Sequence, residues 1–342
     1  MVDTAMNERY AELQAAARSF APKGCRVALL AGGTSAEREI SLSSGDGAQA
    51  ALEEAGFTVS RFDPANPDEM HALEQAARDH LVDVAFLCLH GKGGEDGTIQ
   101  ATLESFGLPY TGSGVEASRC AIDKNVAKCA YKRENLPTAP WVYLESDIVT
   151  RAKERGVFDM VCGKATELLG EHVVVKAVEQ GSTQGLFIAE HAADLGKCVE
   201  QALEFDNSVV VEKFIAGDEF TVAVLGNDEP LALPIIQIVP KSGFYDFEAK
   251  YAPGGSQHLC PAPISPALTQ GIMAYAVEAH RALGCRGMSR TDFIVDADGL
   301  PWILETNTIP GMTKTSLLPD AARVAGLSFP ELCTLLVKLA LE

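Results

Sequence analysis

Short apolar runs alternate with polar, alanine-rich stretches in the first third of the chain. Residues 25–33 (CRVALLAGG) form an apolar run that ends in paired glycines, and a helix-like stretch follows. Two more apolar runs occur at residues 57–63 and 82–91. This order predicts β-α-β units, which build a parallel sheet. Ligands bind at the carboxyl ends of such strands, where residues 32–37 and 90–97 supply glycine-rich turns.

The rest of the chain has a different pattern. A helix is expected at residues 118–135, and strands are expected at residues 172–178 and 208–215. Further apolar runs between residues 219 and 306 are joined by hairpin turns, which predicts antiparallel strands. We therefore expect an α/β protein with an α+β C-terminal part. The expected divisions are an N-terminal extension at 1–24, a parallel α/β domain at 25–112, a central domain at 113–211 and a C-terminal domain at 212–342.

The amino-acid composition excludes several classes of protein. The chain has 342 residues, and its 47% of hydrophobic residues is ample for packed cores. We see no apolar run close to the ~18 residues of a membrane helix, and the N-terminus is polar, so we expect a cytoplasmic protein. The net charge of −19 argues against partners such as nucleic acid or an acidic membrane. The nine cysteines stand singly, and most are expected to be small core residues.

A carboxylate and an amide interrupt the apolar stretch WILETNTIPGMT near the C-terminus. Strand alternation predicts that Glu305 and Asn307 share a face with Ile303. If the preceding hairpin turns at residues 298–299, Asp292 lies opposite Glu305 with the Cβ atoms about 5 Å apart. A longer loop would shift this pairing by one residue.

Two facing carboxylates repel each other unless a cation lies between them or one is protonated. Oxygen ligands from Asp292, Glu305 and Asn307 suit Mg²⁺ and leave coordination sites for phosphate oxygens. A solvated strand face would also explain these charges, and spacing alone does not separate the two explanations. Arg290 lies two residues before Asp292, so its guanidinium should share that face and meet a carboxylate or an oxyanion.

Basic residues and a polar loop predict a phosphate site. Lys176 ends the apolar run VVVK, and a lysine at the end of a buried strand needs an anionic partner. The loop at residues 179–185 offers backbone N–H groups and hydroxyls, as phosphate-binding loops do. Neither GxxxxGK[ST] nor a GxGxxG that opens a helix after a strand occurs in the sequence.

Three further features have both local and functional explanations. Residues 243–257 mix four aromatic residues with charges and glycines, which favours an active-site lid over a disordered connection. Glu37 and His90 belong to glycine-rich turns. Without further support, compensation of a helix N-terminus is the first explanation for Glu37, and a structural hydrogen bond is the first for His90.

Six motifs, in order, resemble those of the D-alanine–D-alanine ligases, which are ATP-grasp enzymes of bacterial cell-wall synthesis. They are GGTSAEREISLSSG, LHGKGGEDGTIQ, PYTGSG, VEKFIAGDEFTVAVL, FYDFEAKY and LETNTIPGMTKTSLLP. The resemblance runs from about Cys25 to Leu335 and leaves the first 24 residues without a counterpart. It implies an ATP-grasp fold of three domains, ATP as co-substrate, two Mg²⁺ ions (with Mn²⁺ as an alternative), D-alanine as substrate and a homodimer.

The resemblance also implies a role for individual residues. The metal ligands would be Asp292, Glu305 and Asn307, with Glu305 bridging the two ions. Residues at ATP would be Lys124, Lys176, Ser182, Glu212, Lys213, Ile215, Glu219 and Lys250. Residues at the two D-alanines would be Glu37, His90, Arg290, Gly311, Ser316 and Leu317. The catalytic group would comprise Glu37, Ser182, Tyr251, Arg290, Gly311 and Ser316.

Some positions depart from the family pattern or bear on the second substrate. Ala177 replaces the usual proline after the strand lysine, and Thr183 and Gln184 replace serine and valine in the loop GSSxG. Tyr251, in the string EAKY, favours D-alanine over D-lactate, while one extra hydroxyl leaves D-serine open. The alternatives are a D-alanine–D-serine or D-alanine–D-lactate ligase, or a non-catalytic ATP-grasp protein that binds nucleotide or a D-amino acid.

Overall fold

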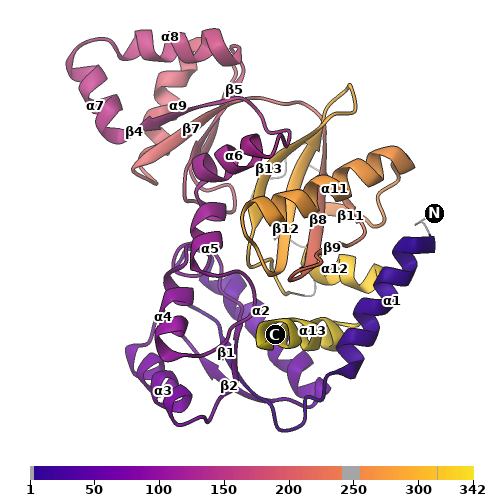
Figure 1. The fold of residues 1–342 in the computed structure, drawn as a ribbon. Helices are drawn as coiled ribbons and strands as arrows, with labels where there is room; N and C mark the ends of the chain where they lie inside the picture. Colours follow the sequence, from indigo (N-terminus) through magenta and orange to yellow (C-terminus); the bar gives the residue numbers. More distant parts are fainter. Residues whose placement is uncertain (1–3, 241–254, 314) are drawn as a thin grey trace.

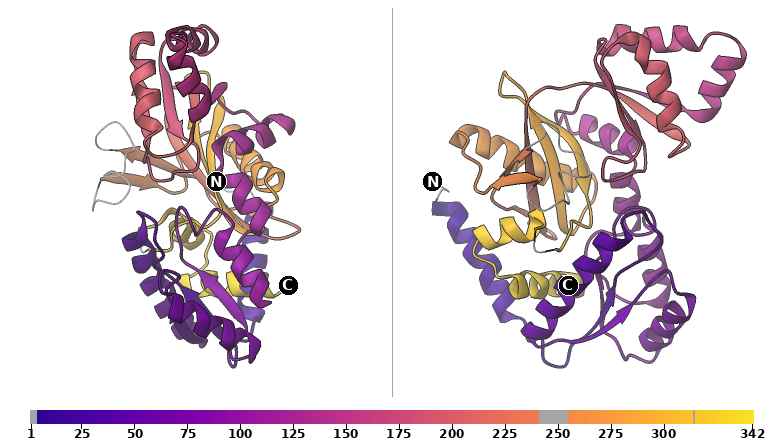
Figure 2. Two further views of the ribbon diagram at one scale, coloured as in Figure 1. Left: turned by 90° about the vertical axis from the view of Figure 1, so that its left-hand side faces the viewer. Right: turned by 180° about the vertical axis from the view of Figure 1, so that it is seen from behind.

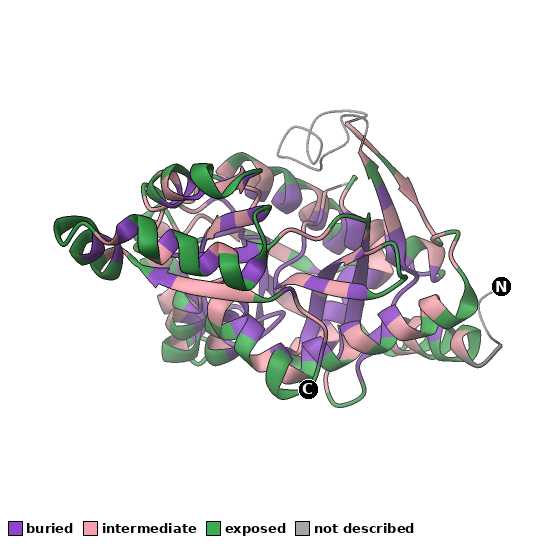
Figure 3. Ribbon diagram, turned by 90° about the horizontal axis from the view of Figure 1, so that it is seen from above, coloured by how far each residue is buried: buried purple, intermediate pink, exposed green. Residues whose placement is uncertain are grey.

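Three β-sheets, each with its own helices, make up the computed structural model (Figure 1). The structure describes residues 4–240, 255–313 and 315–342. In both views of Figure 2 the first sheet lies at the bottom, the middle sheet at the top and the third sheet between them. Buried positions gather along the strands and the inner faces of the helices (Figure 3). This mixed α/β architecture confirms the predicted fold class.

The first sheet is parallel, as predicted, with the strand order β2-β1-β3. The apolar residues of β1 and β3 are buried because α2 and α13 pack against these strands. Helix α13 starts with a capping box in which Ser328 and Glu331 bind each other's backbone N–H groups. The elements are β1 (Arg26–Leu30), α2 (Arg38–Ala55), β2 (Thr58–Phe62), α3 (Pro67–Arg78), β3 (Val84–Leu87), α4 (Thr98–Phe106) and α13 (Phe329–Leu341).

The second sheet is antiparallel, in the order β4-β7-β5-β6. Its inner strands β5 and β7 are the two that the sequence predicts. The edge strands β4 and β6 were not predicted, because they are half-exposed and lack a clear apolar pattern. The elements are β4 (Trp141–Glu145), α7 (Ser146–Glu154), α8 (Phe158–Leu169), β5 (Val173–Ala177), β6 (Leu186–Ala189), η1 (Ala192–Asp194), α9 (Leu195–Ala202) and β7 (Ser208–Lys213).

The third sheet is antiparallel, as predicted, in the order β11-β10-β8-β12-β13, with β9 also paired to β8. The run at residues 230–239 forms two strands and not one. Pro234 lies between them, and proline cannot donate to a sheet ladder. The elements are β8 (Asp218–Gly226), β9 (Leu231–Ala232), β10 (Ile236–Pro240), β11 (Ser256–Leu259), α11 (Pro266–Ala282), β12 (Gly287–Val295), β13 (Pro301–Asn307) and α12 (Leu317–Val324).

The single helix predicted at residues 118–135 is wrong, because the chain forms two helices there. These are α5 (Val115–Ile122) and α6 (Lys124–Arg133). Asp123 separates them, and its side chain accepts a hydrogen bond from the Val126 N–H at 2.9 Å, which caps α6. Lys124 is therefore the first residue of a helix.

Strand alternation fails in β13. Asp292 faces Glu305, as predicted, but a β-bulge follows and Phe293 faces Ile303. Ile303 is consequently fully buried in the core, whereas Glu305 lines a cavity together with Leu304. The predicted shared face of Ile303 and Glu305 is therefore wrong.

Two deviations explain why the predicted acid pair is nevertheless correct. A turn at residues 298–299 would pair Val295 with Trp302. The actual hairpin pairs Val295 with Pro301, a shift of one residue. The extra residue of the bulge restores the expected register at Asp292.

The first residues of the chain form a helix, α1 (Thr4–Ser19), that lies beside α13 (Figure 1). Tyr10 is buried, and its hydroxyl donates to Ala232 O of β9 at 3.1 Å. The Gln14 amide donates to Ala325 O at 3.0 Å, and Arg18 forms an ion pair with Glu331. The N-terminal extension therefore connects the first domain with the third sheet.

Among the described residues, no single helix is long and apolar enough to cross a membrane. The bent pair formed by α12 and α13 meets the length and composition criteria only when its two helices are taken together.

Candidate active site

Two adjoining cavities bring together every predicted site residue that the structure describes. The first is lined by Lys124, Lys176, Glu212, Lys213, Ile215, Glu219 and Asp292, among others. The second is lined by Glu37, His90, Arg290, Asn307, Gly311, Ser316 and Leu317, among others. Gly181, Ser182 and Glu305 line both cavities. Tyr251, Lys250 and most of the predicted lid lie outside the described residues.

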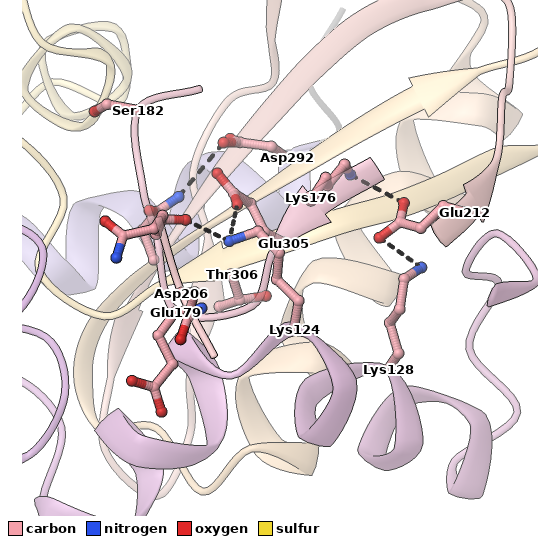
Figure 4. Close-up of polar contacts among 12 residues, drawn as sticks. Lys124, Lys128, Lys176, Glu179, Ser182, Asp206, Glu212, Asp292, Glu305 and Thr306 are labelled. Carbon is pink, nitrogen blue, oxygen red and sulfur yellow. Dashed lines mark hydrogen bonds and ion pairs between the residues drawn. The ribbon is translucent and has the colours of Figure 1, made fainter. Parts of the chain in front are cut away.

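A buried carboxylate between two lysines forms one wall of the first cavity (Figure 4). Lys176 Nζ donates to Glu212 Oε2 at 2.9 Å, and Lys128 Nζ lies 3.5 Å from Glu212 Oε1. Lys128 also donates to Thr138 Oγ1 at 2.7 Å and to Ala139 O at 3.1 Å. Glu212 is thus the anionic partner that the sequence predicts for Lys176.

Burial and charge act in opposite directions on this cluster. Burial by itself would raise the pKa of Glu212, but Lys128, Lys176 and Lys124 outweigh it and lower that pKa. Burial lowers the pKa of the Lys128 ammonium to about 8, although Glu212 opposes that change. Lys128 and Lys176 against the single carboxylate of Glu212 leave local positive charge at this wall of the cavity, which suits an anionic ligand despite the negative net charge of the chain.

The end of β7 forms another wall of the first cavity. Lys213 N–H donates to Pro140 O at 3.0 Å, so of its two backbone groups only the carbonyl can face a ligand. Phe214 lines the cavity and stacks on His172, with ring centroids 3.8 Å apart. Ile215 and Glu219 complete this edge. A flat apolar group held by backbone and aromatic contacts would fit here.

The acid pair of β12 and β13 is neutralised by basic side chains. Arg290 donates to both carboxylate oxygens of Asp292, at 2.9 and 2.8 Å. Lys124 Nζ lies 3.6 Å from Glu305 Oε2. The predicted explanation, a cation between the acids or protonation of one of them, is therefore not required, because each carboxylate has its own cationic partner.

The donor set nevertheless fits Mg²⁺. Asp292 and Glu305 line the first cavity, and Glu305 and Asn307 line the second, so the three side chains meet at the boundary, where Asn307 Nδ2 donates to Asp292 Oδ2 at 3.4 Å. Within residues 4–240, 255–313 and 315–342, no group of three His, Cys, Asp or Glu side chains could hold a metal. Two carboxylates and one amide would leave several coordination sites to a ligand, which is typical of magnesium sites that bind phosphate.

The second cavity begins at a contact between the first domain and the loop after β5. The Ser182 hydroxyl donates to Glu37 Oε1. Ser182 and Thr183 have φ values of 51° and 68°, in the left-handed region that a β-branched threonine rarely adopts. Ser182 therefore lies in a strained part of the loop, at a position where its side chain lines both cavities.

The opposite side of the second cavity is a turn that precedes α12. Ser316 Oγ accepts a hydrogen bond from Thr313 N–H at 3.0 Å. A Cβ atom added to Gly311 would lie 2.7 Å from Ser316 Oγ, so only glycine allows this close approach. Gly311 therefore presents its backbone to the cavity without a side chain in the way.

Two ionisable residues beside the cavities, the buried Lys128 and the half-buried Glu95, were not predicted. Lys128 follows Lys124 by four residues, and the i, i+4 spacing on a helix could have indicated a shared face. Glu95 lies in the predicted glycine-rich motif and accepts bonds from Gly91 N–H at 2.9 Å and Ile309 N–H at 3.2 Å. Burial, followed by the neighbouring Glu37, raises the pKa of Glu95 to about 7.

Family profiles match both halves of the chain. The D-ala D-ala ligase N-terminus profile matches residues 61–113, and the D-ala D-ala ligase C-terminus profile matches residues 131–338. Together they cover more than half of the sequence.

Individual relatives and solved structures agree with the profiles. The D-alanine–D-alanine ligase of Pelotomaculum thermopropionicum is 43% identical over 317 residues, 93% of this chain and 97% of the relative. That of Syntrophobacter fumaroxidans is 46% identical over 92% of this chain and 97% of the relative. The Bacillus anthracis D-alanine–D-alanine ligase complexed with ATP has a TM-score of 0.77 and 30% identity, with 93% of this chain and 98% of that one covered.

Proposed function

This chain belongs to the D-alanine–D-alanine ligase family, and we propose that it uses ATP to join two D-alanine molecules into D-alanyl-D-alanine for peptidoglycan precursors. The observation that carries the proposal is the boundary between the two cavities, where both share Ser182 and Glu305. A phosphate group in the basic first cavity would meet a carboxylate in the second.

The proposed chemistry has two steps. A carboxylate is a poor electrophile, so an oxygen of the first D-alanine attacks the terminal phosphorus of ATP and the bond to ADP breaks. The deprotonated amine of the second D-alanine then attacks the acyl carbon, and phosphate leaves. Both steps concentrate negative charge, which the protein must stabilise with positioned donors and cations.

The first cavity would hold ATP. Lys124 and Lys176 would contact the phosphates, and Ser182 would lie beside them in the loop. Glu212, Lys213 and Ile215 would line the adenine pocket, and Glu219 would bind the ribose hydroxyls. The positive surplus around Glu212 and the flat edge at Phe214 support this orientation.

The second cavity would hold the two D-alanines. Glu37 would bind the ammonium of the first, with His90 nearby. Arg290 and the Gly311 N–H would stabilise the tetrahedral oxyanion. Ser316 and Leu317 would hold the carboxylate of the second. Their positions around one cavity support these roles.

Asp292, Glu305 and Asn307 would hold two magnesium ions, or manganese in their place, with Glu305 bridging. Bound metal would neutralise charge on the phosphates. The residues' own task is to keep three oxygen donors at the boundary of the cavities, and the fixed pairing of Asp292 with Glu305 supports that role.

Several expectations complete the proposal. Tyr251 and Lys250 would belong to a lid at residues 243–257, with Tyr251 linked to Ser182 and Glu37. The domain divisions at 25–112, 113–211 and 212–342, a homodimer and a cytoplasmic location remain part of the proposal.

The direct test is a product analysis by mass spectrometry. The protein is incubated with ATP, Mg²⁺ and an equimolar mixture of D-alanine, D-serine and D-lactate. We expect D-alanyl-D-alanine as the main product, with one ADP formed per dipeptide. A main product that ends in D-serine or D-lactate would replace the proposed second substrate. Absence of any D-alanine-dependent ADP would contradict the ligase function and favour a nucleotide-binding protein.

A further inference from the structure

The chain bends at Thr308 and Ile309 and then runs along the second cavity without regular secondary structure. We call residues 309–312, which carry Gly311, the Gly311 turn. Ile309 O lies 3.2 Å from His90 Nδ1, and Met312 N–H donates to Ser44 Oγ at 3.3 Å. The first and fourth residues of the turn are therefore bonded to side chains of the first domain.

These two side chains also bond to each other. Ser44 Oγ lies 3.1 Å from His90 Nε2. Because Ile309 O can only accept, Nδ1 must carry the ring proton, and Nε2 then accepts from the Ser44 hydroxyl. The Ser44 oxygen in turn accepts from Met312 N–H. Each donor in this chain of hydrogen bonds has one acceptor, and the chain of hydrogen bonds links Ile309 to Met312 at the two ends of the turn.

Burial maintains this arrangement. Ser44 is fully buried and His90 is only 6% exposed. Burial lowers the pKa of His90 to about 4, so the ring is neutral near pH 7, as a single ring proton requires. Helix α2, which carries Ser44, also approaches the turn closely at Gly47, where an added Cβ would lie 3.1 Å from Met312 O.

A third side chain of the first domain fixes the same turn. Glu95 Oε1 accepts from Ile309 N–H at 3.2 Å, and its Oε2 accepts from Gly91 N–H at 2.9 Å. Both backbone polar groups of Ile309 are thus held by the loop that follows β3. The direction of the Gly311 N–H depends on this attachment, because Gly311 itself has no side chain to fix it.

We propose that Ser44 and His90 form a brace that positions the Gly311 turn for the reaction, and that His90 acts through this turn and not on substrate. Both ring nitrogens of His90 are committed to protein partners, as the distances above show. This inference rests on the proposed ligase function, in which the Gly311 N–H stabilises an oxyanion. Loss of the brace would therefore slow the chemical steps with little effect on binding.

The kinetic test compares Ser44→Ala, His90→Asn and the double variant in D-alanine-dependent ADP production. We expect kcat to fall on the order of 100-fold in each single variant, with the KM for D-alanine and ATP essentially unchanged. The double variant should be no slower than the slower single variant, because the two residues act as one unit. A raised KM for D-alanine with normal kcat would overturn the brace and make His90 a substrate contact.

A matched control exists in another buried histidine–serine pair. His280 Nδ1 lies 2.7 Å from Ser289 Oγ, outside both cavities. His280→Asn should lower the melting temperature about as much as His90→Asn but leave kcat normal. Equal loss of kcat in both variants would show a general folding effect and contradict the proposal.

A second measurement requires no variant. Nitrogen-15 NMR of the wild-type imidazoles should show His90 protonated at Nδ1 and unprotonated at Nε2 near pH 7. Protonation at Nε2 would break the chain of hydrogen bonds from Ile309 to Met312 and overturn the brace, whatever the kinetics of the variants.

The activity of the wild-type protein separates the proposed ligase function from the proposed brace. If it forms no dipeptide, the proposed function fails, whereas a normal wild type with unaffected variants refutes only the brace.

Discussion

At the scale of single residues, Lys128 is the buried charge on which the first cavity depends. It is 1% exposed and shares Glu212 with Lys176. Without its ammonium, Glu212 would add more negative charge to the nucleotide site. We expect Lys128→Met to weaken ADP binding about 10-fold, a loss of about 1.4 kcal/mol by titration calorimetry. Lys132→Met is the control, because Lys132 is exposed on the same helix and should leave affinity unchanged. Unaltered binding by Lys128→Met would contradict this role.

Glu305 is the residue on which the metal assignment depends. Glu305→Gln keeps the shape of the side chain but removes the charge opposite Asp292. We expect turnover to fall at least about 100-fold and the Mg²⁺ concentration for half-maximal activity to rise. The check is D-alanine-dependent ADP formation over a magnesium titration. Near-normal activity would show that Glu305 does not hold the metal.

Asp63 makes the stability of the first glycine-rich loop depend on pH. Burial would raise the pKa of Asp63, but hydrogen bonds from Arg38, Gly33 N–H and Ala65 N–H lower it to about 2. The stabilisation is therefore present above the ordinary pKa of 3.8 and lost as the pH falls towards 2. Urea unfolding should show Asp63→Asn to be less stable than wild type near neutral pH, with the difference shrinking below about pH 4. A difference that stays constant with pH would contradict this explanation.

The partner of a charged side chain was predictable from the sequence where the position of that side chain on a strand required one. The anionic partner of Lys176 and the proximity of Arg290 to Asp292 follow from strand positions and from the cost of an unpaired charge. Glu95 and Ser44 could not be found in this way, because their partners are backbone groups of a turn more than two hundred residues away. Nothing in the local sequence marks such a contact.

At the scale of elements, β13 shows why local rules gave a correct pair for an incorrect reason. Alternation predicts one continuous register, but the β12–β13 pairing next to the hairpin turn is shifted by one residue, and a bulge at Leu304 compensates. The bulge allows both Leu304 and Glu305 to face the first cavity while Ile303 and Thr306 stay buried. Sequence spacing carries no signal for a bulge without glycine.

Helix α1 gives a prediction at the same scale. Tyr10 is 4% exposed and bonds to Ala232 O, so it connects α1 with the third sheet. Chemical denaturation should show that Tyr10→Phe costs about 1 kcal/mol for the hydrogen bond. Tyr10→Ala should cost about 3 kcal/mol for the lost packing. Arg18→Ala should cost little, because its ion pair with Glu331 is exposed. Equal stability of Tyr10→Ala and wild type would show that α1 adds nothing to the fold.

At the scale of the whole molecule, the site exists only where three sheets meet. Glu37 and His90 come from the first domain, Ser182 from the loop between β5 and β6 of the middle sheet, and Asp292 and Glu305 from the third sheet. The sequence indicates the parallel and antiparallel sheets from their patterns. It does not indicate the return of α13 to the first domain or the attachment of α1, because both depend on packing between distant segments.

This assembly places a basic cavity and a substrate cavity on either side of Glu305. The central claim is that a phosphate from the first is transferred to a carboxylate in the second. The most direct measurement supplies ATP and D-alanine whose carboxyl oxygens are oxygen-18, and analyses the released phosphate by mass spectrometry. We predict one labelled oxygen in each phosphate, because the carboxylate oxygen that attacks phosphorus leaves with it. Unlabelled phosphate formed together with dipeptide would contradict the account.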